Sequence, residues 1–260
     1  MTKIGNYAFH ECSGLTEVTI PNSVTEIGVQ VFQGCSSLTK VTIPNNVTKI
    51  SDSAFRDCSS LTEMTIPNSV TEIGRDAFHG CNGLKKLTIG EGITYIDRYT
   101  FYGCSGLREL TIPNSVTSIG YHTFYGCSDL KELTIGSSVT DIDNYAFHDC
   151  PSLISVTSLN TTPPKINSGT FDGATEQNAT LHVPSECKTI YKQQPYWENF
   201  FTIQDDVETT SIGSIKVDGR EQTDKDNAIY TINGVRLNTT KTGSLPNGIY
   251  IINGKKTIIK

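Results

Sequence analysis

Residues 50–72 read ISDSAFRDCSSLTEMTIPNSVTE, and this 23-residue unit occurs seven times in succession without an insertion or deletion. Isoleucine opens each unit, phenylalanine follows five positions later, and cysteine comes three positions after that. A fixed period between about 20 and 50 residues indicates a stack of coils rather than a globular enzyme core. The repeat therefore predicts a solenoid whose function depends on the residues that vary at its surface.

One unit contains two extended segments and two turns. In residues 61–66, Met64 and Ile66 face inward and Thr65 outward, an alternation that predicts a short strand. Pro67 ends this strand because proline cannot donate to a β-ladder. Residues 68–69 then predict a turn, residues 70–73 a second extended segment, and residues 54–58 a 3₁₀ or short helical turn. Since one unit cannot bury its apolar residues alone, the units must stack to form one elongated core.

Composition excludes several classes of function. Charged residues make up 18% of the chain, below the roughly 25% of ordinary soluble domains. The net charge of −6 and the pI of about 5.4 give no electrostatic basis for nucleic-acid binding. No apolar stretch reaches the length of a transmembrane segment.

Seven of the eight cysteines recur once per unit, at Cys12, Cys35, Cys58, Cys81, Cys104, Cys127 and Cys150. In a parallel stack they would lie about 4.8 Å apart with parallel side-chain directions, whereas a disulfide needs converging Cβ atoms about 3.8 Å apart. We therefore interpret them as a ladder of small buried apolar side chains. One cysteine per coil cannot build a tetrahedral metal site. Cys187 lies outside the array and is predicted to be unpaired.

The pattern L-x-x-V-T-I-P, preceded by A-F-x-x-C-S-x-L, resembles the BspA-like leucine-rich-repeat family of bacterial surface proteins over residues 1 to about 203. The resemblance implies a β-rich leucine-rich-repeat solenoid of short strands and tight turns. It also implies a cell-surface or secreted protein of Bacteroidetes-type bacteria that functions in adhesion or host-protein binding. The expected partners are host or bacterial surface proteins, with glycans as the alternative. No cofactor and no enzymatic activity are expected.

The sequence suggests four regions. Residues 1–165 hold the seven repeats, and residues 166–203 hold a degenerate eighth repeat and a C-terminal cap with Trp197 in its core. Residues 204–227 are predicted to be a linker with one strand at 214–217. Residues 228–260 contain two Asn-Gly pairs between apolar segments, which predict two hairpins of a small antiparallel β module. This tail resembles C-terminal segments of secreted Bacteroidetes-type proteins, so it is either a sorting or anchoring segment or a small β appendage beside the cap.

The first unit begins only three residues after the start of the chain, so its apolar side chains should face open solvent; these are Ile4, Phe9, Leu15, Val18 and Ile20. The end of a solenoid normally carries a polar capping unit. We therefore expect either a natural protein that is longer at the N-terminus, with its signal peptide outside this chain, or an end-to-end dimer through the uncapped coil.

Two outward columns have mainly structural interpretations. The first carries charges of both signs, which should pair between strands about 4.8 Å apart and fix the register rather than act as catalytic acids; its members are Glu17, Lys40, Glu63, Lys86, Glu109 and Glu132. The second is threonine throughout: Thr19, Thr42, Thr65, Thr88, Thr111, Thr134 and Thr157. An ice-binding face would need a second threonine two residues earlier, where the charged column lies, so β-propensity explains this column better.

The histidines and acidic residues do not suggest a catalytic or metal centre. His10, His79 and His148 share one repeat position but should stand roughly 14 Å apart, three coils from one another. The sequence shows no Ser-His-Asp arrangement and no phosphate-binding glycine loop. An interaction module or a structural spacer without a ligand therefore fits better than a glycan-processing enzyme.

Aromatic residues gather on the outside of units five to seven and form the candidate contact surface: Tyr95, Tyr99, Tyr102, Tyr121, His122, Tyr125, Tyr145 and His148. Tyr99, His122 and Tyr145 should form one column, and Tyr102, Tyr125 and His148 another. Tyrosine and histidine give large contact areas at low entropic cost, which is typical of protein and glycan interfaces. The alternative is that these rings stack on one another and only stabilise neighbouring coils.

Overall fold

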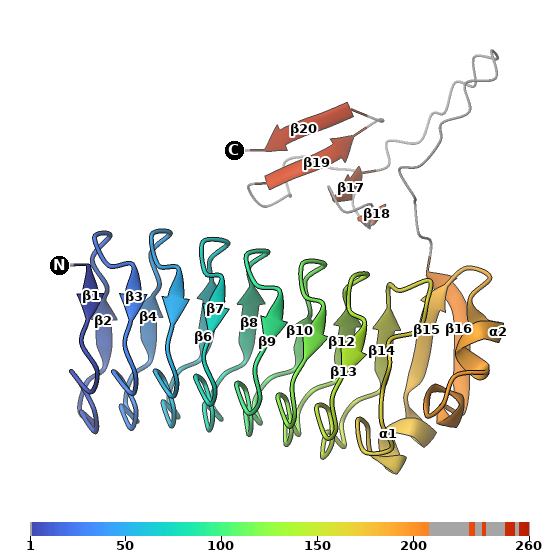
Figure 1. Ribbon diagram of the computed structural model, residues 1–260, viewed down its shortest axis with the longest axis horizontal. Coiled ribbons are helices and arrows are strands. Elements are labelled where there is room, and N and C mark those ends of the chain that lie inside the picture. The colour runs from blue at the N-terminus through green and yellow to red at the C-terminus, as the bar shows by residue number, and fades with distance from the viewer. Residues whose placement is uncertain (1, 208–228, 232–235, 238–247, 253–254, 260) are drawn as a thin grey trace. The chain divides into compact units, whose positions relative to one another are not determined.

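The computed structural model describes residues 2–207, 229–231, 236–237, 248–252 and 255–259. The chain divides into two compact units, Met1–Asp206 and Val207–Lys260. The larger unit is a stack of about nine turns with two short strands in each repeat, which confirms the predicted β-rich solenoid (Figure 1).

One row of strands contributes two residues per repeat, and its members are β1 (Lys3–Ile4), β3 (Glu26–Ile27), β5 (Lys49–Ile50), β7 (Glu72–Ile73), β9 (Tyr95–Ile96), β11 (Ser118–Ile119) and β13 (Asp141–Ile142). Wherever two of these strands pair they are parallel, with each isoleucine opposite the isoleucine of the neighbouring coil. The 23-residue period therefore becomes an isoleucine column inside the solenoid, and all seven of these isoleucines are buried.

The second row is β2 (Glu17–Thr19), β4 (Lys40–Thr42), β6 (Glu63–Ile66), β8 (Lys86–Ile89), β10 (Glu109–Thr111), β12 (Glu132–Ile135) and β14 (Ser155–Ser158). It continues beyond the repeats into β15 (Thr180–Pro184) and β16 (Thr202–Val207). In β6 and β8 exposed and buried residues alternate, as the period-2 pattern predicts.

The segment after each two-residue strand is not helical, in contrast to the prediction for residues 54–58. Its amides alternate between two partners. The Arg56 and Cys58 N–H groups donate within the coil to the Ser53 and Phe55 carbonyls (3.1 and 3.3 Å), while the Phe55 N–H donates to Ala77 of the next coil (2.7 Å). A helix would use every amide within the segment, so successive tight turns are the conformation that also joins the coils.

Stacked phenylalanine rings form the centre of the core. Consecutive rings from Phe32 to Phe147 have centroids 5.2–5.3 Å apart and are within 17° of parallel. Beside them, each thiol from Cys35 to Cys150 donates to the phenylalanine carbonyl 26 residues earlier. These cysteines are free and buried, and Cys187 is also free.

The first coil differs from the prediction at three positions. Cys12 is exposed rather than buried, because no earlier coil supplies a phenylalanine carbonyl and a covering surface. Ile4 and Ile20, expected to face solvent, are only 8% and 4% exposed because they point into the core. The expectation holds for the ring of Phe9, which is 38% exposed.

Aromatic residues close the C-terminal end of the solenoid. Phe171 continues the phenylalanine stack 5.6 Å from Phe147, and Trp197 packs at 5.8 Å from Phe171. Trp197 is fully buried, and its indole N–H donates to the Pro164 carbonyl (2.7 Å), so it lies in the cap core as predicted. The fully buried Tyr191 hydroxyl donates to the Ser158 hydroxyl (2.6 Å).

Short helices support this closing segment: α1 (Gly173–Asn178), α2 (Lys188–Lys192) and the 3₁₀ helix η1 (Trp197–Asn199). The Asp172 carboxylate caps α1 by accepting the Thr175 N–H (2.7 Å). Strand β16 extends to Val207, so residues 204–207 belong to the sheet and not to the predicted linker. The strand predicted at 214–217 lies outside the described residues.

The smaller unit contains β17 (Ile229–Thr231), β18 (Arg236–Leu237), β19 (Gly248–Ile252) and β20 (Lys255–Ile259) in one sheet. Strand β17 is antiparallel to β18, and β19 is antiparallel to β20. These are the two strand pairs that the Asn-Gly dipeptides predict, and the sheet confirms the small antiparallel β tail.

The strand rows are interrupted along the stack. In the first row, one sheet has the order β1-β3-β5-β7 and a separate sheet contains β9, β11 and β13. In the second row, β6 pairs with β8, and β10, β12 and β14 belong to another sheet. Within the residues that the structure describes, this is the one place where both rows lose their pairing, and we call it the open seam: β7 against β9 and β8 against β10.

The residues that follow β8 and β10 differ in what they allow between neighbouring coils. Gly90 follows β8 where most units have proline, and a Cβ there would lie 2.6 Å from the Pro67 carbonyl carbon, so the glycine permits close packing on the preceding coil. Pro113 follows β10 and has no N–H to donate back to β8. Proline alone does not open a seam, because β2 and β4 pair although Pro44 follows β4.

Candidate contact surface

The aromatic residues of units five to seven form two ladders along the turn side of the solenoid. In the first ladder, Tyr99 stacks on His122 (5.3 Å between centroids), which lies 4.9 Å from Tyr145. In the second, Tyr102 stacks on Tyr125 (5.1 Å, 4° from parallel), which stacks on His148 (5.8 Å). The columns expected from the repeat are therefore present, with their rings in direct contact.

The first ladder occupies a strained backbone position. Tyr99, His122 and Tyr145 have φ values of 59°, 55° and 61°, in the left-handed region. Units two to four fill this position with Gln30, Ser53 and Asp76, and unit one carries Tyr7 there. Bulky residues rarely adopt this conformation, which costs on the order of 1–3 kcal/mol at each site. At these three positions the backbone conformation is unfavourable for a bulky residue, and the stacking of the rings acts against this conformational cost.

Tyr121 and Tyr95 differ in their relation to the ladders. Tyr121 meets Tyr99 and Tyr145 edge to face, at 5.7 and 5.9 Å, and its ring lies 3.9 Å from that of His122. Tyr95 lies in β9 instead, where its hydroxyl donates to Asp97 (3.4 Å). No ring contact among the described residues joins Tyr95 to the ladders, so it is separate from the cluster with which the sequence grouped it.

The ladders are less open than an outward-facing sequence position implies. Among the eight candidate residues, Tyr95 and Tyr145 are exposed, at 46% and 38%, and the others are half-buried. The rings cover one another, so the intramolecular stacking that the sequence offered as an alternative is present. What remains accessible is the outer edge of the cluster, where Tyr145 and the half-buried Tyr121 lie.

The two ladder histidines carry an unusual polar feature. The Nδ1 atoms of His122 and His148 are buried and have no hydrogen-bond partner among the described residues. Burial lowers the pKa of His122, and the nearby His148 lowers it further. His122 is therefore held neutral within an otherwise aromatic environment. Burial also raises the pKa values of the Tyr121 and Tyr125 hydroxyls, which therefore stay protonated at neutral pH.

His79 is a member of the second ladder that the sequence interpretation did not include. Its ring stacks on Tyr102 at 4.7 Å, and its Nδ1 lies 3.0 Å from an Asp76 oxygen, which also lies 3.4 Å from the Arg56 guanidinium. Burial lowers the pKa of His79, and Arg56 acts in the same direction. The signal was present, because His79 and Tyr102 are 23 residues apart.

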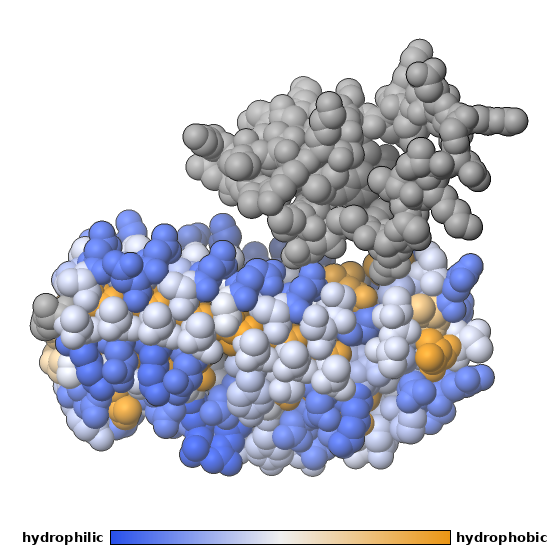
Figure 2. Space-filling view, turned by 45° about the horizontal axis from the view of Figure 1, so that its top comes forward, coloured by the Kyte–Doolittle hydropathy of each residue, from blue (hydrophilic) through white to orange (hydrophobic). Residues whose placement is uncertain are grey.

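The other outward columns are regular. The threonine column lies on the second strand row, in register wherever its strands pair. Figure 2 shows pale rows along the solenoid, with apolar atoms visible in narrow gaps between them. Among the described residues no ion pair joins members of the Glu17–Glu132 column, contrary to expectation. The pairs form on the other strand row, between Lys3 and Glu26 (2.7 Å) and between Lys49 and Glu72 (2.6 Å).

The described residues contain no group of three or more His, Cys, Asp or Glu side chains that could hold a metal ion. No helix among them is both long and apolar enough to cross a bilayer.

Comparison with known proteins agrees with this architecture. A family model described as "BspA type Leucine rich repeat region", in 6 copies, matches residues 1–108 and 71–196. A search among curated proteins finds no match.

Solved structures of bacterial repeat proteins are similar to this chain. A leucine-rich repeat protein from Eubacterium ventriosum is 30% identical, with a TM-score of 0.56 over 61% of this chain and 43% of that one. One from Bacteroides ovatus is 23% identical, with a TM-score of 0.51 over 70% of this chain and 59% of that one. The chain thus spans less than two thirds of either relative. The repeat register, the ladders of the core and the family match together show that the chain belongs to the BspA-type leucine-rich-repeat family.

Proposed function

We propose that this chain is a non-catalytic interaction module of a cell-surface or secreted protein, which functions in adhesion or host-protein binding. The contact surface is the aromatic cluster formed by the two ladders and Tyr121. The observation that carries the proposal is the placement of three bulky rings at left-handed backbone positions in adjacent coils. The repeat alone does not require aromatic residues there, since Ser53 and Asp76 occupy the same position in units three and four.

Physical chemistry supports a binding role for such a cluster. Tyrosine is enriched at the energetic centres of protein interfaces, because it combines a large apolar area with a hydroxyl. Rings that are already stacked lose little conformational freedom when a partner binds, and this lowers the entropic cost of association. The unpartnered Nδ1 atoms of His122 and His148 are polar groups that a small shift of the rings would offer to a ligand.

Leucine-rich-repeat proteins generally bind proteins, so the proposed partners are host or bacterial surface proteins. Glycans are the alternative partner, since tyrosine faces also pack on sugar rings. A structural spacer without a ligand is the alternative function, in which the stacking only stabilises units five to seven. A sorting or anchoring role for the β tail stays a proposal. So does an end-to-end dimer through the exposed Phe9 ring, which light scattering at high protein concentration tests.

The test of the contact surface uses the accessible edge of the cluster rather than its centre. Tyr121→Asn and Tyr145→Ser are combined in one variant, because Asn144 and Ser53 occupy the same two positions in other units. Tyr7→Ser is the matched control, since Tyr7 is exposed at the same left-handed position outside the cluster. Full-length proteins are tested for binding to extracellular-matrix and plasma proteins and to a glycan array.

The proposal expects saturable binding to a protein that the double variant loses and the Tyr7→Ser control retains. Binding that both variants retain would move the site elsewhere on the solenoid. If the wild-type chain binds nothing, the spacer interpretation replaces the proposal. Turnover of a glycan on the array would instead revive the enzymatic alternative.

A further inference from the structure

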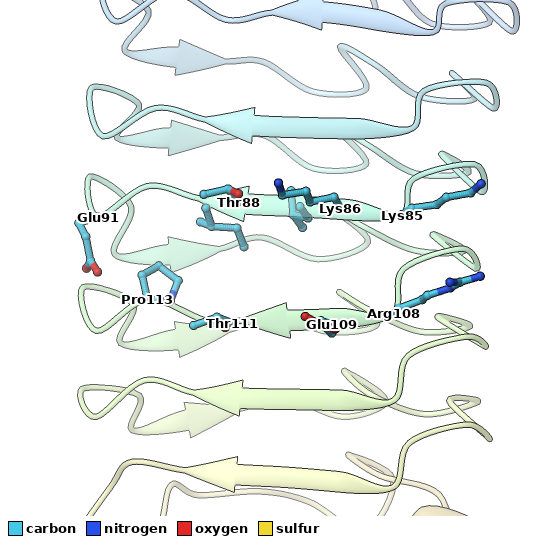
Figure 3. Close-up of a pocket in the computed structure, with 10 residues that line it drawn as sticks. Lys85, Lys86, Thr88, Glu91, Arg108, Glu109, Thr111 and Pro113 are labelled. Atoms are coloured by element: carbon cyan, nitrogen blue, oxygen red, sulfur yellow. The ribbon is translucent and has the colours of Figure 1, made fainter. Parts of the chain in front are cut away.

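A groove lies in the open seam, on the strand face of the solenoid. It has a volume of about 590 Å³ and runs between β8 and β10. The strands on its two sides are not paired, and in Figure 3 β8 and β10 lie farther apart than the paired strands β6 and β8 or β10 and β12. The coils remain joined on the turn side, where the Phe78 and Gly80 N–H groups donate to Thr100 and Tyr102 (both 2.8 Å).

The groove is polar and basic at one end. Lys85 and Arg108 lie side by side there and point the same way from adjacent coils, with Lys86 close by on β8 (Figure 3). At the other end Glu91 is already engaged, because it accepts the Ser115 N–H across the seam (3.2 Å). The basic end is therefore the part that is open to a ligand.

The groove also carries one carboxylate on β10, that of Glu109 (Figure 3), but no ion pair with it is formed by the cations among the described residues. Among the described residues, Lys85, Lys86 and Arg108 form no ion pair within 4.0 Å, whereas Lys3 and Lys49 pair with glutamates. Lys131 extends the row by one coil, since Lys85, Arg108 and Lys131 follow one another at 23-residue spacing. The first three units have threonine at this position. In a chain with a net charge of −6, this is a local concentration of positive charge.

The lining distinguishes between classes of anionic ligand. None of the residues that line the groove is aromatic, so it lacks the aromatic anchors typical of peptide sites. Leu87, Ile89 and Pro113 supply its apolar lining, and its walls carry the exposed hydroxyls of Thr88 and Thr111. Hydroxyls beside a row of cations match a ligand that carries both hydroxyl and acidic groups. The volume of the groove lies within the range of small-molecule sites and so suits a short run of sugars.

We propose that this groove binds an anionic polysaccharide, a chain bearing carboxylate or sulfate groups, of which a short stretch lies between β8 and β10. Lys85 and Arg108 meet its acidic groups at the basic end, and the hydroxyls of Thr88 and Thr111 bind sugar hydroxyls. The site is separate from the aromatic cluster and does not depend on it.

Isothermal titration of the full chain with two acidic probes, a heparin hexasaccharide and a hexagalacturonate, tests the proposal. A neutral maltohexaose and a hexaglutamate peptide are the ligand controls. The test variant combines Lys85→Thr with Arg108→Thr, which introduces the residue that the chain itself uses at this position in units one to three. The matched control combines Lys40→Thr with Arg75→Asn and removes the same charge from exposed positions outside the groove. Thermal melting establishes that both variants are folded.

We expect saturable binding of at least one acidic oligosaccharide, weakened by rising ionic strength because exposed charges are screened. The test variant should raise Kd about fourfold to 25-fold, since each of the two exposed charge contacts contributes a factor of about two to five. The control variant should change Kd less than about twofold. Equal losses in both variants, stronger binding of hexaglutamate, or no binding of either acidic oligosaccharide would each overturn the assignment. The Tyr121→Asn, Tyr145→Ser variant should bind as wild type does, so failure here and failure of the aromatic contact surface are distinguishable.

Discussion

Replacing Tyr125 by glutamine measures how much the second ladder stabilises the solenoid. Glutamine is the natural residue at this position in unit two, Gln33, so the turn should tolerate it. The substitution removes stacked contacts with Tyr102 and His148, at 5.1 and 5.8 Å, and a tilted contact with His122 at 4.9 Å. Each aromatic pair contributes about 0.5–1.5 kcal/mol. Because Tyr125 is half-buried, we expect the free energy of unfolding to fall by about 1.5–3 kcal/mol.

Tyr7→Gln is the control for this prediction. Tyr7 is 56% exposed and makes one edge-to-face contact, with His10 at 5.9 Å. Its replacement should change the free energy of unfolding by less than about 0.5 kcal/mol, as is usual for surface substitutions.

Urea denaturation followed by circular dichroism gives the two values. Because repeat arrays can unfold in segments, hydrogen exchange of peptides from units five to seven shows where Tyr125→Gln acts. A loss in Tyr125→Gln no larger than that in Tyr7→Gln would refute the stabilising role of the ladder. It would leave the stacked rings of the second ladder without a structural role, and thus favour the contact role.

Three further predictions concern the packing, the histidines and the thiols. Gly90→Ala should lower the free energy of unfolding by about 1–3 kcal/mol, because the added Cβ would lie 2.6 Å from a backbone carbon of the preceding coil. Gly14→Ala, with open space around it, should be neutral or slightly stabilising in the same urea assay. Equal effects of the two substitutions would contradict the steric argument. Burial lowers the pKa of His122 in the folded state, so the unfolded chain takes up protons first and stability should fall as the pH drops below about 6.5. In melting curves recorded at several pH values, His122→Gln should reduce the dependence of the melting temperature on pH. An unchanged pH dependence would rule out a contribution from His122. Burial raises the pKa values of the six ladder thiols from Cys35 to Cys150. A thiol reagent should therefore modify Cys12 and, more slowly, Cys187 in the native protein, and should modify all eight cysteines only after unfolding. Rapid modification of more than two cysteines in the native protein would disprove the buried cysteine ladder.

The period predicts the solenoid because each inward column must stack on itself to be buried. It predicts the Phe55 and Cys58 columns, the cap position of Trp197 and the ring columns of the candidate surface. It does not predict the conformation of residues 54–58, because the competition between bonds within a coil and bonds to the next coil is decided by stacking rather than by helix propensity.

Two features of the surface depend on information that spacing does not contain. The burial of Tyr102 or Tyr125 depends on how the rings tilt against one another, which a column assignment leaves open. The open seam lies where a glycine at 90 is followed one unit later by a proline at 113, each ordinary in its own unit. The repeat pattern alone does not show which neighbouring strands pair.

The bonds between coils have a consequence for how such a molecule can change its length. On the turn side, the Phe55 N–H donates forward to Ala77 of the next coil, while on the strand side the Thr48 N–H donates backward to Thr25 (2.9 Å). Both bonds join backbone to backbone and therefore do not depend on which side chains are present. A complete unit gained or lost by duplication would restore every such bond at its new boundary, whereas a partial unit would leave a row of donors opposite no acceptor. The array can therefore lengthen or shorten its reach in steps of one coil, while the surface of each unit varies independently.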